Sequence, residues 1–126
     1  MNVVLDTCAA LALAAGTLPD DASAALRQAS EARVSVVTAW EIAIKVASGK
    51  LGLAVPPARW FAILLEHHQL RDVPLDAETV CAAAALPPIH RDPFDRAIVA
   101  LARTHDATIL TSDERIRRYP GVTVRW

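Results

Sequence analysis

Short apolar runs alternate with helix-like segments along this chain, and this alternation constrains the fold more than any other feature of the sequence. The apolar runs fall at 2–5, 34–37, 73–75, 108–110 and 122–124. Their length and composition are typical of buried strands. Parallel strands need crossover connections, which are usually helices. The alternation therefore predicts an α/β fold in which helices cover both faces of a parallel sheet.

Helix start and stop residues give the expected bounds of the segments between these strands. Glycines and prolines end most of them, and Asp76 and Asp92-Pro93 are typical start signals. The expected helices cover 7–15, 21–32, 38–48, 56–68, 76–86, 112–118 and a segment from 93 to beyond 102. At 126 residues the chain is long enough for one domain, spanning 1–126, and too short for two.

Four acidic residues each follow a strand-like run or lie in the first turn of an expected helix. They are Asp6, Glu41, Asp95 and Asp113. Each has a structural explanation, since Thr38 and Glu41 fit a capping box and the aspartates fit helix caps or first turns. Capping does not require all four to meet, however. In a parallel sheet the helix N-termini gather at the carboxyl ends of the strands, so we expect one shared acidic site there.

A shared acidic site needs a counter-charge. At an effective dielectric constant near 20, two carboxylates about 4 Å apart repel each other by roughly 4 kcal/mol. A divalent cation relieves this repulsion, and carboxylate clusters prefer the hard ions Mg²⁺ and Mn²⁺. Such ions commonly serve phosphate chemistry, so the pattern predicts a metal site that acts on phosphate groups.

The segments around the four acids resemble the PIN domain family and, within it, the VapC-type toxins of bacterial toxin–antitoxin pairs. The similar segments cover nearly the whole chain in the family's order: VVLDT, VTAWEIAIKVASGKLGL, HRDPFDRAIVALA and ILTSDERIRRYPGVTVRW. The resemblance implies a three-layer α/β/α fold with a five-stranded parallel sheet. It also implies that the acidic quartet holds Mg²⁺ or Mn²⁺ for RNA hydrolysis, that the protein forms a homodimer, and that a cognate antitoxin neutralises it.

Three polar residues are candidates for supporting the acids. Thr7 and Ser112 are expected either to hydrogen-bond the carboxylates or to cap helices. Lys45 lies four residues after Glu41, so it either pairs with that glutamate on the helix surface or reaches the scissile phosphate.

Three basic residues flank the third acid and form the best local patch for an RNA backbone: His90, Arg91 and Arg96. An ion pair with a neighbouring carboxylate is an equal alternative for Arg96. A local patch is needed because the net charge is only −1 and the isoelectric point is about 6.4. The overall field of the protein therefore does not attract nucleic acid.

Cellular location and metal chemistry are also limited by the sequence. Cys8 and Cys81 lack the spacing of a thiolate metal site, and we interpret both as small buried residues in a reducing compartment. Asp6 interrupts the N-terminal apolar run before it reaches the length of a signal peptide, and no run is long enough to span a membrane. These features predict a cytoplasmic protein.

Other functions remain as alternatives. A phosphatase of the haloacid dehalogenase type is excluded, because it needs an aspartate where Cys8 stands. A nucleotide-binding Rossmann domain is excluded as well, because no GxGxxG or phosphate-binding lysine loop is present. A PIN-like nuclease that processes RNA or cleaves DNA outside a toxin–antitoxin pair keeps the same chemistry. A catalytically silent PIN-fold binding module is the second alternative, although such a module would be expected to lack one or more of the four acids.

Overall fold

The computed structural model describes all of residues 1–126 and contains one five-stranded, fully parallel sheet. The sheet has the strand order β3-β2-β1-β4-β5. The strands are β1 (Asn2–Leu5), β2 (Glu31–Ser35), β3 (Arg71–Val73), β4 (Ala107–Leu110) and β5 (Thr123–Arg125). The predicted parallel sheet is confirmed, and the central strand β1 pairs with both β2 and β4.

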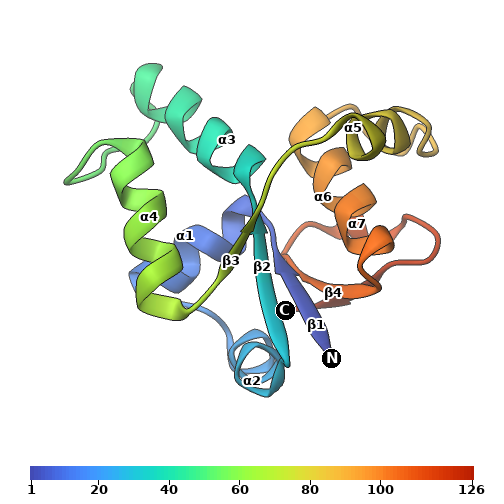
Figure 1. Cartoon of the computed structure of the whole chain (residues 1–126), viewed down its shortest axis with the longest axis horizontal. Helices are drawn as coiled ribbons and strands as arrows, with labels where there is room; N and C mark the ends of the chain where they lie inside the picture. Colours follow the sequence, from blue (N-terminus) through green and yellow to red (C-terminus); the bar gives the residue numbers. More distant parts are fainter.

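Seven helices surround this sheet (Figure 1). On one side lie α1 (Thr7–Ala15), α2 (Asp20–Gln28) and α4 (Pro57–His68), and on the other lie α5 (Ala77–Ala84), α6 (Pro93–Thr104) and α7 (Glu114–Arg117). Helix α3 (Val36–Ala47) packs against both α4 and α6. The fold is therefore a three-layer α/β/α sandwich, as expected. None of its helices has the length and hydropathy of a membrane span.

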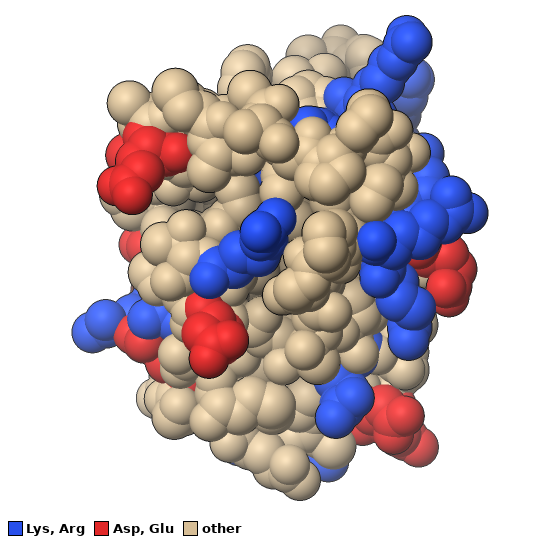
Figure 2. All heavy atoms as spheres, turned by 90° about the vertical axis from the view of Figure 1, so that its right-hand side faces the viewer, with Lys and Arg blue, Asp and Glu red and all other residues tan.

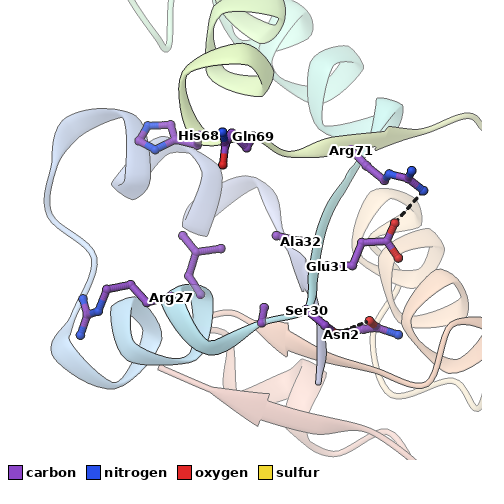
Figure 3. Close-up of a pocket in the computed structure, with 10 residues that line it drawn as sticks. Asn2, Arg27, Ser30, Glu31, Ala32, His68, Gln69 and Arg71 are labelled. Atoms are coloured by element: carbon purple, nitrogen blue, oxygen red, sulfur yellow. Dashed lines mark hydrogen bonds and ion pairs between the residues drawn. The ribbon is translucent and has the colours of Figure 1, made fainter.

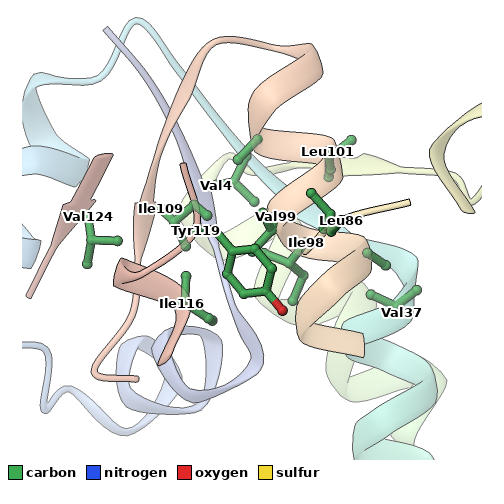
Figure 4. Packing of buried hydrophobic residues seen from close by; sticks show 12 residues of the cluster. Val4, Val37, Leu86, Ile98, Val99, Leu101, Ile109, Ile116, Tyr119 and Val124 are labelled. Atoms are coloured by element: carbon green, nitrogen blue, oxygen red, sulfur yellow. The ribbon is translucent and has the colours of Figure 1, made fainter. Parts of the chain in front are cut away.

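Alternate residues of the strands face the two helical layers, as the twofold repeat of a strand requires. Val3 and Leu5 pack with residues of α1, α2 and α4. Val4 and Ile109 pack on the opposite face with α6, α7 and Tyr119 (Figure 4). Burial on both faces explains why the central strands appear as continuous apolar runs in the sequence.

The prediction was wrong around residue 30. The second helix ends at Gln28 instead of continuing to about 32, and β2 covers 31–35 instead of 34–37. Glu31 and Arg33 are polar but pair with each other within the strand, which hides the strand signal. Val36 and Val37 are β-branched yet helical, because the Ser35 hydroxyl caps α3 by accepting from the Val37 N–H at 3.1 Å.

The other differences between prediction and structure are shifts of element ends. The third strand covers 71–73 instead of 73–75, α5 ends at Ala84 instead of Leu86, and α7 covers 114–117 instead of 112–118. Element ends are the least specific part of a sequence pattern. None of these shifts moves a strand or helix to another layer.

The strand order determines where a site is expected. The chain adds β2 and β3 on one side of β1 and then crosses to add β4 and β5 on the other side. The connections therefore diverge at the carboxyl ends of β1 and β4, which open a crevice in folds of this kind. Asp6 and Thr111 directly follow these two strand ends.

Candidate active site

The four predicted acids lie together. All of them line a cavity of about 470 Å³ at the carboxyl ends of β1 and β4. Most of the residues that line it are polar or charged; the lining comprises Asp6, Thr7, Cys8, Leu11, Glu41, Lys45, Asp92, Asp95, Ser112 and Asp113. Residues far apart in the sequence thus meet at one edge of the sheet, as the acidic pattern predicted.

Asp6 is the most deeply buried of the four, with 3% of its surface exposed. It caps α1, since its Oδ1 accepts from the Ala9 N–H at 2.8 Å, and its Oδ2 accepts a hydrogen bond from the Thr111 hydroxyl. The pKa of Asp6 is raised to about 6: burial is the main cause, the nearby charges of Glu41 and Asp113 add to the rise, and the two hydrogen bonds oppose it. Asp6 is therefore both a helix cap and a member of a shared site.

Glu41 lies in the second turn of α3 and not in a capping box. The N-cap of α3 is Ser35, and Thr38 is a fully buried residue within the helix. The Thr7 hydroxyl donates to Glu41 Oε1 at 2.8 Å, and the Lys45 ammonium lies 3.0 Å from Oε2. Thr7 thus makes the predicted hydrogen bond to a carboxylate, and Lys45 makes the predicted ion pair with Glu41. The Glu41 carboxylate is held from two directions.

Asp95 lies in the first turn of α6, beside the helix cap Asp92. The pKa of Asp95 is raised to about 7, mainly by burial and also by the charges of Asp92, Asp6, Glu41 and Asp113. The sequence pattern identified Asp92 only as a helix start. Its Oδ1 does accept from the Phe94 and Asp95 N–H groups, at 2.9 and 3.2 Å, but Asp92 also contributes a fifth carboxylate to the cavity.

Asp113 differs from the other acids in its charge environment. It caps α7, and the guanidinium of Arg115 contacts both of its carboxylate oxygens, at 3.2 and 3.0 Å. These hydrogen bonds lower the pKa of Asp113. Its side chain is 23% exposed, against 13% for Asp95. Asp113 therefore stays ionised more readily than Asp6 or Asp95, and of the four acids it lies nearest to solvent.

His90 has another role than the predicted contact with an RNA backbone. Its side chain is buried, with Nε2 3.3 Å from Asp95 Oδ2 and Nδ1 2.6 Å from the Tyr119 hydroxyl. Desolvation, followed by the nearby charge of Arg115, lowers the pKa of His90. A buried neutral imidazole offers no charge to a phosphate, so the ring supports Asp95 instead.

Arg96 is also turned away from the cavity. Its guanidinium donates to the backbone carbonyls of Ala83, Ala84, Leu86, Pro87 and His90 and to the Tyr119 hydroxyl, at 2.8 to 3.4 Å. These contacts replace both the predicted phosphate contact and the alternative carboxylate pair. Of the three predicted basic residues, only Arg91 is exposed, and it lines a neighbouring apolar cavity.

The two cysteines are exposed, contrary to the prediction that both are buried. Cys8 follows Thr7 at the start of α1 and lines the acidic cavity, where its Sγ lies 3.3 Å from the Ser112 hydroxyl. Ser112 therefore contacts a thiol and not a carboxylate. Sequence reasoning missed Thr111, although its position directly after a predicted strand and beside Asp113 was a usable signal.

A larger cavity, of about 690 Å³, lies away from the acids (Figure 3). It opens near the amino ends of β1 and β2, where Arg71 pairs with Glu31 at 2.7 Å. On the face formed by α5, α6 and α7, basic side chains occur as several groups with acidic groups between them (Figure 2). Only the cavity at the carboxyl ends of the strands combines several carboxylates with strongly shifted pKa values.

Comparisons with known proteins agree with this geometry. A sequence model of the PIN domain matches residues 3–122. Ribonuclease VapC22 of Mycobacterium tuberculosis is 33% identical over 108 residues, covering 83% of this chain and 82% of that protein. VapBC2 of Rickettsia felis, solved with a promoter DNA fragment, has a TM-score of 0.70 at 17% identity and covers 98% of this chain and 97% of that one. FitAcB of Neisseria gonorrhoeae has a TM-score of 0.61 at 21% identity, with 97% and 95% covered.

The two structural likenesses concern the fold alone, because their sequence identities are low. The family match and the 33% identical relative go further, since both extend over most of the chain. The resemblance seen in the sequence motifs is thereby confirmed, and this chain belongs to the PIN domain family, in its VapC-type branch.

Proposed function

We propose that this chain, as one PIN domain over 1–126, is a metal-dependent endoribonuclease and the toxin of a toxin–antitoxin pair. The observation that carries the proposal is the convergence of four carboxylates, from four separate segments, on one cavity. Their mutual repulsion contributes to the raised pKa values of Asp6 and Asp95. The name of the relative from Mycobacterium tuberculosis, a ribonuclease, supports the activity.

The donor set fits Mg²⁺ or Mn²⁺, because these hard cations prefer carboxylate oxygens and the repelling charges need compensation. Asp6, Glu41 and Asp95 would hold the principal ion. A divalent cation in such a site supplies Lewis acidity, which makes hydroxide available near neutral pH and neutralises charge on the phosphate. Asp113, nearer to solvent and held ionised by Arg115, would receive a second ion or a water that arrives with the substrate.

The surrounding residues preorganise these acids. Thr111 and the N–H of Ala9 hold the two oxygens of Asp6, and Thr7 holds Glu41 from the opposite side of its carboxylate to Lys45. Fixed acceptors keep the site in its binding geometry before the substrate arrives, so less reorganisation is needed in the reaction. Thr111 is an addition to the supporting residues that the sequence suggested.

RNA would enter along the open side of the cavity. The Lys45 side chain is 40% exposed while its ammonium stays beside Glu41, so it is placed to contact a phosphate at the acids. Arg91 is exposed nearby and is proposed as a second backbone contact. In-line attack by water would leave 5′-phosphate and 3′-hydroxyl ends, without using the 2′-hydroxyl of the RNA.

Two protein partners are part of the proposal, in the cytoplasm where RNA is available. A homodimer is supported by an apolar cavity of about 290 Å³ between α3, α5 and α6, lined by the exposed Trp40, Leu75 and Val80. A cognate antitoxin is supported by structural neighbours described as toxin–antitoxin complexes, among them one from Klebsiella pneumoniae. Both partners would cover apolar surface that the isolated chain leaves open.

A cleavage assay on a mixed cellular RNA pool tests the activity. Wild type and Asp95→Asn are compared with Mg²⁺, with Mn²⁺ and with EDTA, and Asp106→Asn is the matched control. Asp106 is exposed, and its positive φ of 50° suits asparagine equally well. We expect discrete cuts that need both the metal and Asp95, and sequencing of the new 5′ ends identifies the target.

Two results would redirect the proposal. Absence of cuts by folded, antitoxin-free protein would favour the catalytically silent binding module. Metal-dependent cuts in DNA but not in RNA would favour a nuclease outside toxin–antitoxin biology.

A further inference from the structure

A chain of hydrogen bonds leads from the protein interior to Asp95. Arg96 Nη1 lies 3.2 Å from the Tyr119 hydroxyl, which lies 2.6 Å from His90 Nδ1. His90 Nε2 lies 3.3 Å from Asp95 Oδ2. The proposed catalysis does not otherwise use Tyr119, Arg96 or His90.

The donor and acceptor groups of these residues give the chain of hydrogen bonds a direction. A guanidinium only donates, so Arg96 occupies a lone pair of the Tyr119 oxygen. The hydroxyl is then free to direct its own proton to His90 Nδ1. A neutral imidazole that accepts at Nδ1 carries its proton on Nε2, the nitrogen that faces Asp95. Donation therefore runs from Arg96 through Tyr119 and His90 to the carboxylate.

Each member of this chain is held in place by other contacts. Five backbone carbonyls hold the Arg96 guanidinium at the end of α5 and in the loop before α6. The Tyr119 ring is 2% exposed and packs in the core beside Ile98 and Val99 (Figure 4). The His90 ring packs against the Tyr119 ring, with 5.4 Å between centroids. The Nε2–H is therefore aimed by rigid surroundings.

We propose that His90 is a positioning residue for Asp95, and that Arg96 and Tyr119 select the tautomer of His90. The Nε2–H holds Asp95 Oδ2 in place and leaves Oδ1 free for a cation. This inference rests on the proposed function, in which Asp95 is a metal ligand. Partners of this kind typically change metal affinity by about 10- to 100-fold when they are removed.

A competing role for His90 is that of a direct metal ligand. Ligand atoms of His90, Asp95 and Asp113 all lie within 4.8 Å of one another. Direct ligation needs a lone pair on Nε2, and hence a proton on Nδ1 that is donated to Tyr119. The oxygen of Tyr119 would then accept from both His90 and Arg96. The two roles therefore require opposite tautomers.

The tautomer of His90 is the first readout, measured from the ¹⁵N shifts of its ring nitrogens in the metal-free wild type and in Tyr119→Phe, at a pH well above the pKa of about 7 of Asp95 so that this carboxyl group is ionised. We expect a proton on Nε2 in the wild type and a mixture of tautomers in Tyr119→Phe, which lacks the hydroxyl. A proton on Nδ1 in the wild type would overturn the inference and favour the direct ligand. Because the wild type needs no substitution, this readout does not depend on how a variant folds.

Mn²⁺ affinity by calorimetry is the second readout. His90→Ala should weaken binding by about tenfold or more. His90→Gln keeps an N–H donor at the depth of Nε2 and should stay within about threefold of the wild type, as should the surface control His67→Gln. If folded His90→Ala and the wild type bind Mn²⁺ with equal affinity, the inference is overturned while the proposed function stands. Absence of Mn²⁺ binding by the wild type would overturn the proposed function, while the ring shifts would still test the hydrogen-bond chain.

Discussion

Asp95→Asn removes a carboxyl group whose pKa the fold raises from 3.8 to about 7. With a raised pKa, the folded state binds the proton more tightly than the unfolded state. The stability due to this group is therefore complete below pH 3.8 and is lost as the pH rises through 7. A shift of about three units corresponds to about 4 kcal/mol, at about 1.36 kcal/mol per unit. Screening by solvent at this partly open site reduces the expected effect to about 2 kcal/mol.

Asparagine does not titrate, so Asp95→Asn lacks this loss. Between pH 4 and pH 8, we expect the free energy of unfolding of the variant to gain about 2 kcal/mol relative to the wild type. Urea denaturation with EDTA at both pH values measures this difference, and the comparison cancels any effect of the amide that does not depend on pH. Asp106→Asn should show no such gain. A constant difference between Asp95→Asn and wild type, or a change of the opposite sign, would refute the argument that a buried carboxylate, crowded by other acids, destabilises the metal-free cavity.

Two further substitutions and one labelling experiment test other parts of the site. Lys45→Met should reduce RNA cleavage about tenfold in single-turnover assays while changing the unfolding free energy by less than about 0.5 kcal/mol, as for an i,i+4 pair; a loss of stability without a loss of rate would contradict the phosphate contact. Arg96→Ala should destabilise the fold by about 2–4 kcal/mol by leaving carbonyls unpaired, with an unchanged salt dependence of RNA binding; a smaller salt slope would restore the phosphate role. In a Cys81→Ser background, maleimide labelling of Cys8 should block cleavage and Mn²⁺ should slow the labelling; full activity after labelling would place Cys8 outside the working cavity.

The layers of the fold were predictable because local and tertiary signals agree in its centre. Val3, Val4 and Leu5 are buried on both faces of the sheet, and such strands appear as uninterrupted apolar runs. The agreement fails at β2, where the polar side chains of Glu31 and Arg33 pair with each other, and in α3, where the Ser35 cap starts the helix at Val36 and Val37. Propensity is a weak guide where side chains find such compensating contacts.

The acids of the site were predictable for a different reason. A carboxylate after a strand end is placed by topology, which the order of strands and helices reveals. Topology does not determine in which direction a long side chain points. His90 and Arg96 flank Asp95 in the sequence and have the composition of a phosphate-binding patch, yet both turn toward Tyr119, 23 or more positions later in the chain. Tyr119 comes within reach of both side chains only once the C-terminal segment is folded against α6.

The pairing of β1 with β4 has a consequence for the synthesis of the protein. These neighbouring strands are separated by most of the sequence, and Asp6 obtains its hydrogen bond from Thr111 only when β4 is in place. In a nascent chain that has not yet released β4, Asp113 is missing and Asp6 lacks its hydrogen bond from Thr111. Non-local strand pairing is also slow compared with helix formation. If the proposed function holds, the acidic cavity is completed, and cleavage becomes possible, only when the last strands join the sheet.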